Sequence, residues 1–227
     1  MSIHTETVAN STHENSLFNI NCARSQMYKI LSMGFLYPEE KTINFFANEI
    51  NSIIDLIGDN LPFNIHDSLA ILSQEAAKIR VSDLQDIQSE YVRLFDYKPK
   101  CYITEATYRE HKALGNNTLD VNCFYRQAGL KVDVLEFPDH LAVELEFMHY
   151  LSYHATQAHE PTDTMENLAT QFSFLEQHLI TWGPALCLSI QAETKHRFYN
   201  ALANAARKFI DLDHKFLEEL SGATEMH

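Results

Sequence analysis

The side chains best suited to chemistry lie in one short segment, where a proline precedes an aspartate, a histidine and an apolar stripe. The order Pro138, Asp139, His140 predicts the first turn of a helix, because proline lacks the N–H that would be unpaired there. Asp139 would then face the positive end of the helix dipole. Glu144 follows His140 by four residues and would share its helix face. Carboxylates beside an apolar surface favour a partner that carries positive charge and apolar bulk.

Two other spacings suggest a di-metal carboxylate centre. Glu146 and His149 form an E-x-x-H, and Asp211 and His214 form a D-x-x-H. Di-iron bundles use two E-x-x-H motifs and two further carboxylates from facing helices. The second motif has Asp for Glu, and such spacings arise by chance in a chain with 12 His. A helical di-metal enzyme is therefore an alternative, which metal analysis of the purified protein would decide.

Helices must position these residues, and the sequence predicts an all-α fold. Only 6 Gly and 6 Pro occur in 227 residues, which favours long helices over many short strands. Apolar residues recur at helical spacing in roughly nine or ten segments. The expected helices cover residues 16–37, 41–57, 67–80, 82–95, 105–114, 118–128, 138–158, 164–180 and 191–220, with a short one from 182.

The expected organisation is a single helical domain over residues 16–220. Residues 1–15 are polar and predict a disordered tail, and residues 221–227 predict a flexible one. A connector near residues 131–137 would allow two lobes. It would also allow helices to exchange between chains, so a swapped homodimer is an open alternative.

Charge and cysteine usage narrow the classes of partner and compartment. The 17 basic and 31 acidic residues give a net charge of −14, so we expect no nucleic-acid binding and some preference for cationic partners. The alternative is that acidity only keeps the protein soluble. No apolar run of about 18 residues occurs, so we expect no stable membrane insertion. The four cysteines form no C-x-x-C and no secretory leader is evident, which indicates a cytoplasmic protein.

Three segments carry a resemblance to a known family. They are residues 90–95 (EYVRLF), residues 136–148 (EFPDHLAVELEFM) and residues 174–179 (FLEQHL) with Trp182 close behind. The chain resembles the cytoplasmic chaperones that mature molybdenum oxidoreductases, the TorD/DmsD/NarJ group of redox enzyme maturation proteins. The second segment is the most specific, because it looks like the family's E-P-D-H signature with Phe137 between Glu136 and Pro138.

The resemblance implies an all-helical chaperone that binds the twin-arginine signal peptide and the apo form of a molybdopterin oxidoreductase. It would delay export of that enzyme and assist cofactor insertion. Arginine pairs well with carboxylates in a fork geometry, and the apolar run of a signal peptide needs a groove. The expected peptide-binding residues are Pro138, Asp139, His140, Glu144, Glu90, Tyr91, Phe95, Phe147 and Met148.

Simpler interpretations of the same residues remain open. Asp139 would only cap its own helix, His140 would pack against Glu144, and Tyr91 and Phe95 would belong to the core. We expect no catalytic residue, no bound metal and no cofactor. A passive assembly scaffold without a peptide groove is a further alternative, and calorimetry with a twin-arginine peptide would separate it from the chaperone.

Overall fold

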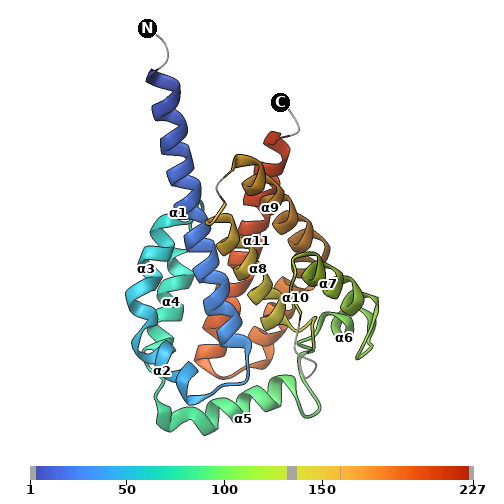
Figure 1. The fold of residues 1–227 in the computed structure, drawn as a ribbon. Coiled ribbons are helices and arrows are strands. Elements are labelled where there is room, and N and C mark those ends of the chain that lie inside the picture. The colour runs from blue at the N-terminus through green and yellow to red at the C-terminus, as the bar shows by residue number, and fades with distance from the viewer. Residues whose placement is uncertain (1–3, 132–136, 159, 225–227) are drawn as a thin grey trace.

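The computed structural model describes residues 4–131, 137–158 and 160–224, and within these ranges the fold is all-α, as predicted (Figure 1). The only pairing of β type in the described ranges is an isolated bridge between Thr104 and His140. The helices are α1 (His4–Phe35), α2 (Glu40–Asn48), α3 (Ile50–Asn60), α4 (His66–Ala76), α5 (Leu84–Phe95), α6 (Glu105–Glu110), α7 (Asn116–Gln127), α8 (Leu141–Ala155), α9 (Pro161–Phe174), α10 (Ile180–Glu193) and α11 (Arg197–Thr224). Short turns at η1 (Val81–Asp83) and η2 (Leu175–Leu179, a π-helix) precede α5 and α10.

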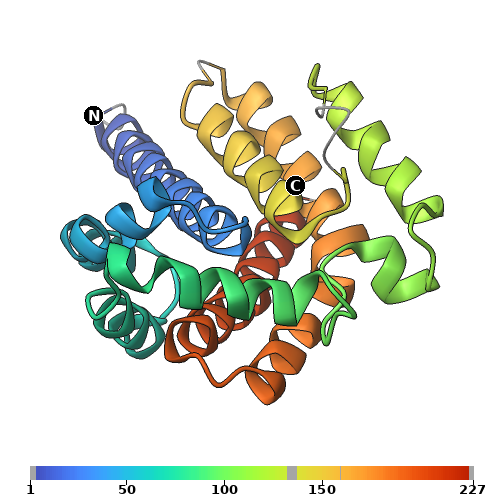
Figure 2. The ribbon, with the colours of Figure 1, turned by 90° about the horizontal axis from the view of Figure 1, so that it is seen from below.

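Helix α8 lies between α1 and α9, and α11 packs against α10, α4 and α9. The small helices α6 and α7 stand on the opposite side of the bundle from α2, α3 and α4 (Figure 1). Helix α5 crosses one end of the bundle, as the view from below shows (Figure 2). Buried apolar side chains from α1 to α11 form one cluster, so the described residues make a single helical fold.

A buried ion pair joins the first long helix to the last. Arg24 Nε lies 2.5 Å from Asp213 Oδ1, and Arg24 Nη2 donates to Asp213 Oδ2 at 2.9 Å; both side chains are fully buried. Tyr28 donates its hydroxyl to the same Oδ2 at 2.6 Å, and Asn21 Oδ1 accepts from Arg24 Nη1 at 2.7 Å. These bonds satisfy the two charges within the core, as buried ions require.

Some helix boundaries differ from the prediction. The helix expected over 41–57 is broken at Glu49 into α2 and α3. Two polar side chains bond to nearby carbonyls there, Asn48 to Asn44 and Ser52 to Glu49, and such local bonds compete with a continuous helix. The segments expected as 164–180 and a separate short helix instead follow one another without a loop, through the π-helix η2.

The ends of the chain are more helical than expected. Helix α1 begins at His4, inside the segment 1–15 that the sequence predicts as a disordered tail, and α11 continues to Thr224. No glycine or proline occurs before Gly34, so nothing in the sequence interrupts α1. Most of the expected connector, residues 132–136, lies outside the described residues, and so does Glu136 of the signature. None of the described helices is both long and apolar enough to cross a membrane.

Candidate functional site

The signature segment does not begin helix α8 in the way the sequence predicts. Pro138 and Asp139 form a turn ahead of the helix, which starts at Leu141. His140 is the N-cap, and its Nδ1 accepts from the Ala142 N–H at 3.1 Å. Two backbone bonds hold the turn to the chain before α6, from Glu105 N to Asp139 O at 2.8 Å and from Leu141 N to Ile103 O at 3.0 Å. The prediction of Pro138 as a first helical residue is therefore wrong, because this backbone pairs with a distant segment.

Asp139 caps a neighbouring helix and not its own. Its side chain is fully buried, and Oδ2 accepts from the Ala106 N–H of α6 at 2.8 Å and from the Thr118 hydroxyl of α7 at 3.1 Å. Burial raises the pKa of Asp139, and the bond from Ala106 opposes that rise. Asp139 therefore joins α6 and α7 to the start of α8.

Glu144 is also fully buried, on the side of α8 that faces the core. Its Oε2 accepts from Trp182 Nε1 at 3.1 Å. Burial, together with the nearby Glu105, raises the pKa of Glu144 well above its usual value. Glu105 in turn pairs with Arg109 and with His178, whose Nδ1 lies 2.9 Å from Glu105 Oε2.

Glu105, Asp139 and Glu144 thus form a buried carboxylate cluster. It draws together α6, α8, the turn ahead of α8 and the π-helix η2. One interpretation of the sequence paired His140 with Glu144. In the structure the His140 Nδ1 instead accepts from the Ala142 N–H. Burial lowers the pKa of His140 to about 4, so it is neutral near pH 7. The carboxyl side chains of this cluster are directed inward.

The residues predicted on α5 lie apart from this cluster. Glu90 pairs with Arg93 at 2.7 Å and accepts from the Thr194 hydroxyl at 2.6 Å; the bond to Arg93 lowers the pKa of Glu90 to about 2. Tyr91 and Phe95 are buried with ring centroids 5.0 Å apart. These contacts attach α5 to the turn between α10 and α11. Among the described residues, no hydrogen bond or ring contact joins this group to the buried carboxylate cluster.

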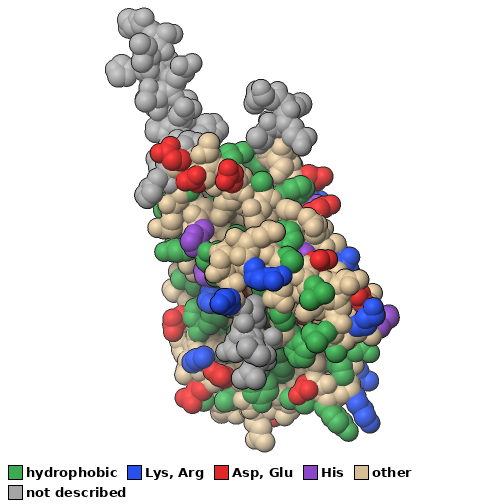
Figure 3. All heavy atoms as spheres, turned by 45° about the vertical axis from the view of Figure 1, so that its right-hand side comes forward, with side chains coloured by type: hydrophobic (Ala, Val, Ile, Leu, Met, Phe, Trp, Pro, Cys, Tyr) green, Lys and Arg blue, Asp and Glu red, His purple; other side chains and the backbone are tan. Residues whose placement is uncertain are grey.

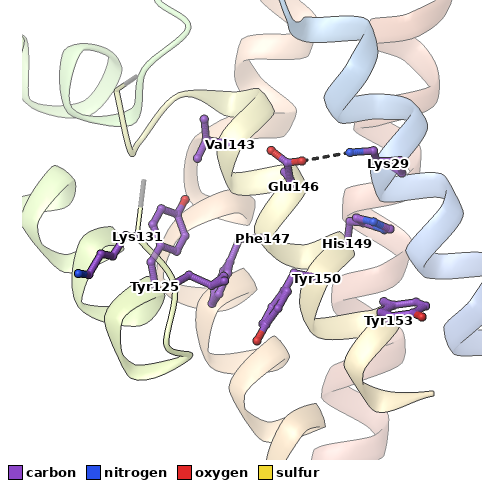
Figure 4. A pocket seen from close by; sticks show the side chains of 10 residues that line it. Lys29, Tyr125, Lys131, Val143, Glu146, Phe147, His149, Tyr150 and Tyr153 are labelled. Carbon is purple, nitrogen blue, oxygen red and sulfur yellow. Dashed lines mark hydrogen bonds and ion pairs between the residues drawn. The ribbon is translucent and has the colours of Figure 1, made fainter. Parts of the chain in front are cut away.

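The opposite face of α8 forms the floor of a groove of about 350 Å³, here called the α8 groove (Figure 4). Four of its floor residues are spaced three or four apart and share one helix face, and the fifth, Phe147, lies at the edge of that face. The five are Val143, Glu146, Phe147, Tyr150 and Tyr153. Phe147, which the sequence predicts as a site residue, lines this groove but is only 3% exposed, and Met148 is fully buried in the core.

Helices α1 and α7 supply the walls of the α8 groove. On the α1 side, Lys29 Nζ lies 3.0 Å from Glu146 Oε1, and Figure 4 shows this pair beside His149. On the other side stand Tyr125 of α7 and Lys131. The Tyr125 and Phe147 rings meet edge to face with centroids 4.7 Å apart. The groove is aromatic, with charged groups at its margins.

Most of the α8 groove residues were not predicted from the sequence. The signal that would have found them is the recurrence of Val143, Glu146, Tyr150 and Tyr153 at helical spacing on the face opposite Glu144. Lys29 has no such signal, because it approaches from a helix more than a hundred residues away. On the face of the molecule in Figure 3, acidic, basic and hydrophobic side chains are interspersed.

The motifs that suggested a di-metal centre do not converge. Glu146 pairs with Lys29, while the His149 Nδ1 lies 2.9 Å from the Ser25 Oγ. His214 pairs with Glu176 on another face of the molecule. In the described ranges, no group of three or more His, Cys, Asp or Glu side chains is arranged to hold a metal ion.

Comparisons with known proteins agree with this architecture. The family model described as nitrate reductase delta subunit matches residues 59–188. The chaperone protein TorD of Vibrio cholerae is 35% identical over 88% of this chain and 94% of the relative. A perchlorate reductase assembly chaperone protein of Dechloromonas aromatica is 26% identical over 83% of this chain and 87% of the relative. A crystal structure of a redox enzyme maturation protein from Archaeoglobus fulgidus, 22% identical, covers 83% of this chain and 93% of its own with a TM-score of 0.56, and shares the fold.

Proposed function

The chain belongs to the nitrate reductase delta subunit family, which includes the TorD chaperones, and on this premise we propose that it binds the twin-arginine signal peptide of a molybdopterin oxidoreductase. The same chaperone holds the apo form of that enzyme in the cytoplasm, delays its export and assists insertion of the cofactor. It performs no chemistry itself. Membership of this family supports the chaperone role, and the α8 groove supports binding of the signal peptide.

The observation that carries the proposal is the aromatic α8 groove. Ligand sites are concave and mostly apolar with a few placed polar groups, and the groove has this composition. Tyr150 and Tyr153 offer rings to the apolar run of a signal peptide, and the buried Phe147 packs behind them; apolar helical faces bind in such grooves. Glu146 supplies a carboxylate at the margin for an arginine.

In this proposal, one of the predicted site residues lines the groove, and the others stabilise the helices around it. Phe147, which is only 3% exposed, supports the aromatic floor of the groove from below. Pro138, Asp139, His140 and Glu144 fix the start and the inner face of α8, so they set the shape of the floor without touching the peptide. Met148 packs behind the floor, and Glu90, Tyr91 and Phe95 stabilise the distant end where α5 crosses.

Calorimetry with a synthetic twin-arginine signal peptide tests this proposal. The wild-type chain should bind it, and replacing both arginines by alanines should weaken binding about tenfold or more, as loss of charge-assisted bonds requires. Tyr150→Ala should weaken binding by a similar factor. Tyr97→Ala, at a side chain that is 74% exposed and outside the groove lining, is the matched control and should leave binding unchanged.

An affinity that does not change when the arginines are replaced would overturn the signal-peptide role. A passive assembly scaffold would then be the better account of the chain.

A further inference from the structure

We propose that Lys29 is an internal substitute for a partner's arginine: it pairs with Glu146 in the α8 groove and is displaced when an arginine-bearing segment binds. This inference rests on the proposed function, and it names the carboxylate that receives the arginine and the residue that competes for it.

Glu146 is the only carboxylate among the described side chains that line the α8 groove. It is already engaged, because Lys29 Nζ from α1 lies 3.0 Å from its Oε1. Two lysines, Lys29 and Lys131, line the same groove, so its described charged side chains carry no excess of negative charge. An arginine that binds both oxygens of Glu146 in a fork geometry would take the place of Lys29 at Oε1.

The Lys29–Glu146 pair is easily exchanged. The two side chains are 38% and 54% exposed, and ion pairs in such surroundings contribute little to stability. Arginine has two advantages over lysine as a partner for Glu146. Its fork can bind both carboxylate oxygens, and its guanidinium is more weakly hydrated and stacks on aromatic rings such as those of Tyr150 and Tyr153 nearby.

The contact between α1 and α8 does not depend on this pair. One turn away, the Ser25 Oγ lies 2.9 Å from the His149 Nδ1, and on the other side the Ser32 hydroxyl donates to the Ala142 carbonyl at 2.8 Å. Lys29 can therefore release Glu146 while both helices stay in place. For the same reason, a variant without Lys29 should fold normally.

Burial lowers the pKa of His149, which keeps this neighbour uncharged near pH 7. The competition at Glu146 is thus between two cations, Lys29 and the incoming arginine.

The test compares Lys29→Met with Lys131→Met, which removes the same charge from the other wall of the groove. Calorimetry uses the full chain and a twin-arginine peptide at low salt, with unfolding in urea to confirm that each variant folds as the wild type does. Lys29→Met should raise affinity about three- to fivefold, whereas Lys131→Met should raise it less than about twofold, because only general repulsion is relieved there. Glu146→Gln should weaken binding about tenfold and should cancel the gain in the double variant.

Equal gains from the two lysine variants, or a Lys29→Met gain that persists without Glu146, would overturn the inference. If the wild type still distinguishes the arginine peptide from its alanine version, the proposed function stands while this inference fails. If no variant distinguishes the two peptides, both fail.

Discussion

Asp139 and Glu144 each keep one oxygen without a hydrogen-bond partner among the described residues, the Asp139 Oδ1 and the Glu144 Oε1. Burying an unpaired acceptor is costly, and the cost is larger for a charged carboxylate than for a neutral acid. Burial raises the pKa of both groups, and the nearby Glu105 adds to the rise. The protein therefore stabilises the neutral form of an acid at the centre of its fold.

Glu144→Gln should make stability less dependent on pH. The folded pKa of Glu144 is raised, so the folded chain holds a proton that the unfolded chain releases above about pH 4.5. Stability should therefore fall as the pH rises from that value through the folded pKa. Gln does not ionise, so it removes this pH dependence, while its side-chain oxygen can still accept from Trp182. Urea unfolding at about pH 5 and about pH 8 should show a smaller loss for the variant, by about 1–3 kcal/mol. Equal losses in both chains would contradict the assignment.

Asp139→Ala should destabilise α6 and α7 more than the rest of the molecule. The change leaves the Ala106 N–H and the Thr118 hydroxyl without their acceptor, at a cost of about 1–3 kcal/mol. Hydrogen exchange measured by mass spectrometry should therefore speed up first in residues 105–127. Thr118→Val removes the bond from Thr118 to Asp139 and the bond that Thr118 accepts from the Gly115 N–H, but it keeps the bond from Ala106, so exchange in α6 should change less than with Asp139→Ala. An equal increase in the exchange rate across all helices would contradict a local role of Asp139 at α6 and α7.

The sequence identifies Asp139 and His140 as special but assigns Asp139 to the wrong helix. A capping residue and its own helix are adjacent, so a local pattern suggests that pairing. In the structure Asp139 accepts instead from the Ala106 N–H, 33 residues away, and only the folded chain brings the two together. The position of Lys29 beside Glu146 could not be predicted for the same reason.

At the scale of helices, composition and periodicity were sufficient for the fold class and most segments. Two helices lie near their predicted places: α4 near the expected 67–80 and α5 near the expected 82–95. The loop predicted over residues 96–104 follows α5. The break at Glu49 escaped prediction, because apolar spacing continues through it from Phe46 to Ile50 and Ile54.

The buried pair between α1 and α11 should be a major source of helix-to-helix stability. Asp213→Ala would leave Arg24 charged and unpaired in the core, and we expect a loss of about 3–5 kcal/mol in the free energy of unfolding. Replacing both residues by apolar ones, Arg24→Met with Asp213→Leu, should recover most of that loss. Lys41→Ala, which breaks an exposed pair with Glu39, is the control and should change little. A double variant as unstable as Asp213→Ala would contradict this account; urea unfolding measures all four chains.

At the scale of the whole molecule, the net charge of −14 should speed the capture of cationic peptides. Raising the salt from about 0.05 M to about 0.5 M should slow association of a twin-arginine peptide several-fold, because screening shortens the reach of the field. Stopped-flow fluorescence measures this rate. A peptide with alanines in place of the arginines but the same apolar run should show a much weaker salt effect. Identical salt effects would mean that the acidity serves solubility alone.

Asp139 caps α6, a helix other than its own, so a loss-of-function screen could not tell its role from that of a peptide-contacting residue. A screen that scores peptide binding would rank Asp139 with the residues that contact the peptide. Loosening α6 and α7 would shift Tyr125, which lines the α8 groove. Cargo preference would instead reside in the outward residues of α8. Grafting Val143, Glu146, Tyr150 and Tyr153 onto a related chaperone should then transplant that preference, while exchange of the Pro138–His140 turn should not.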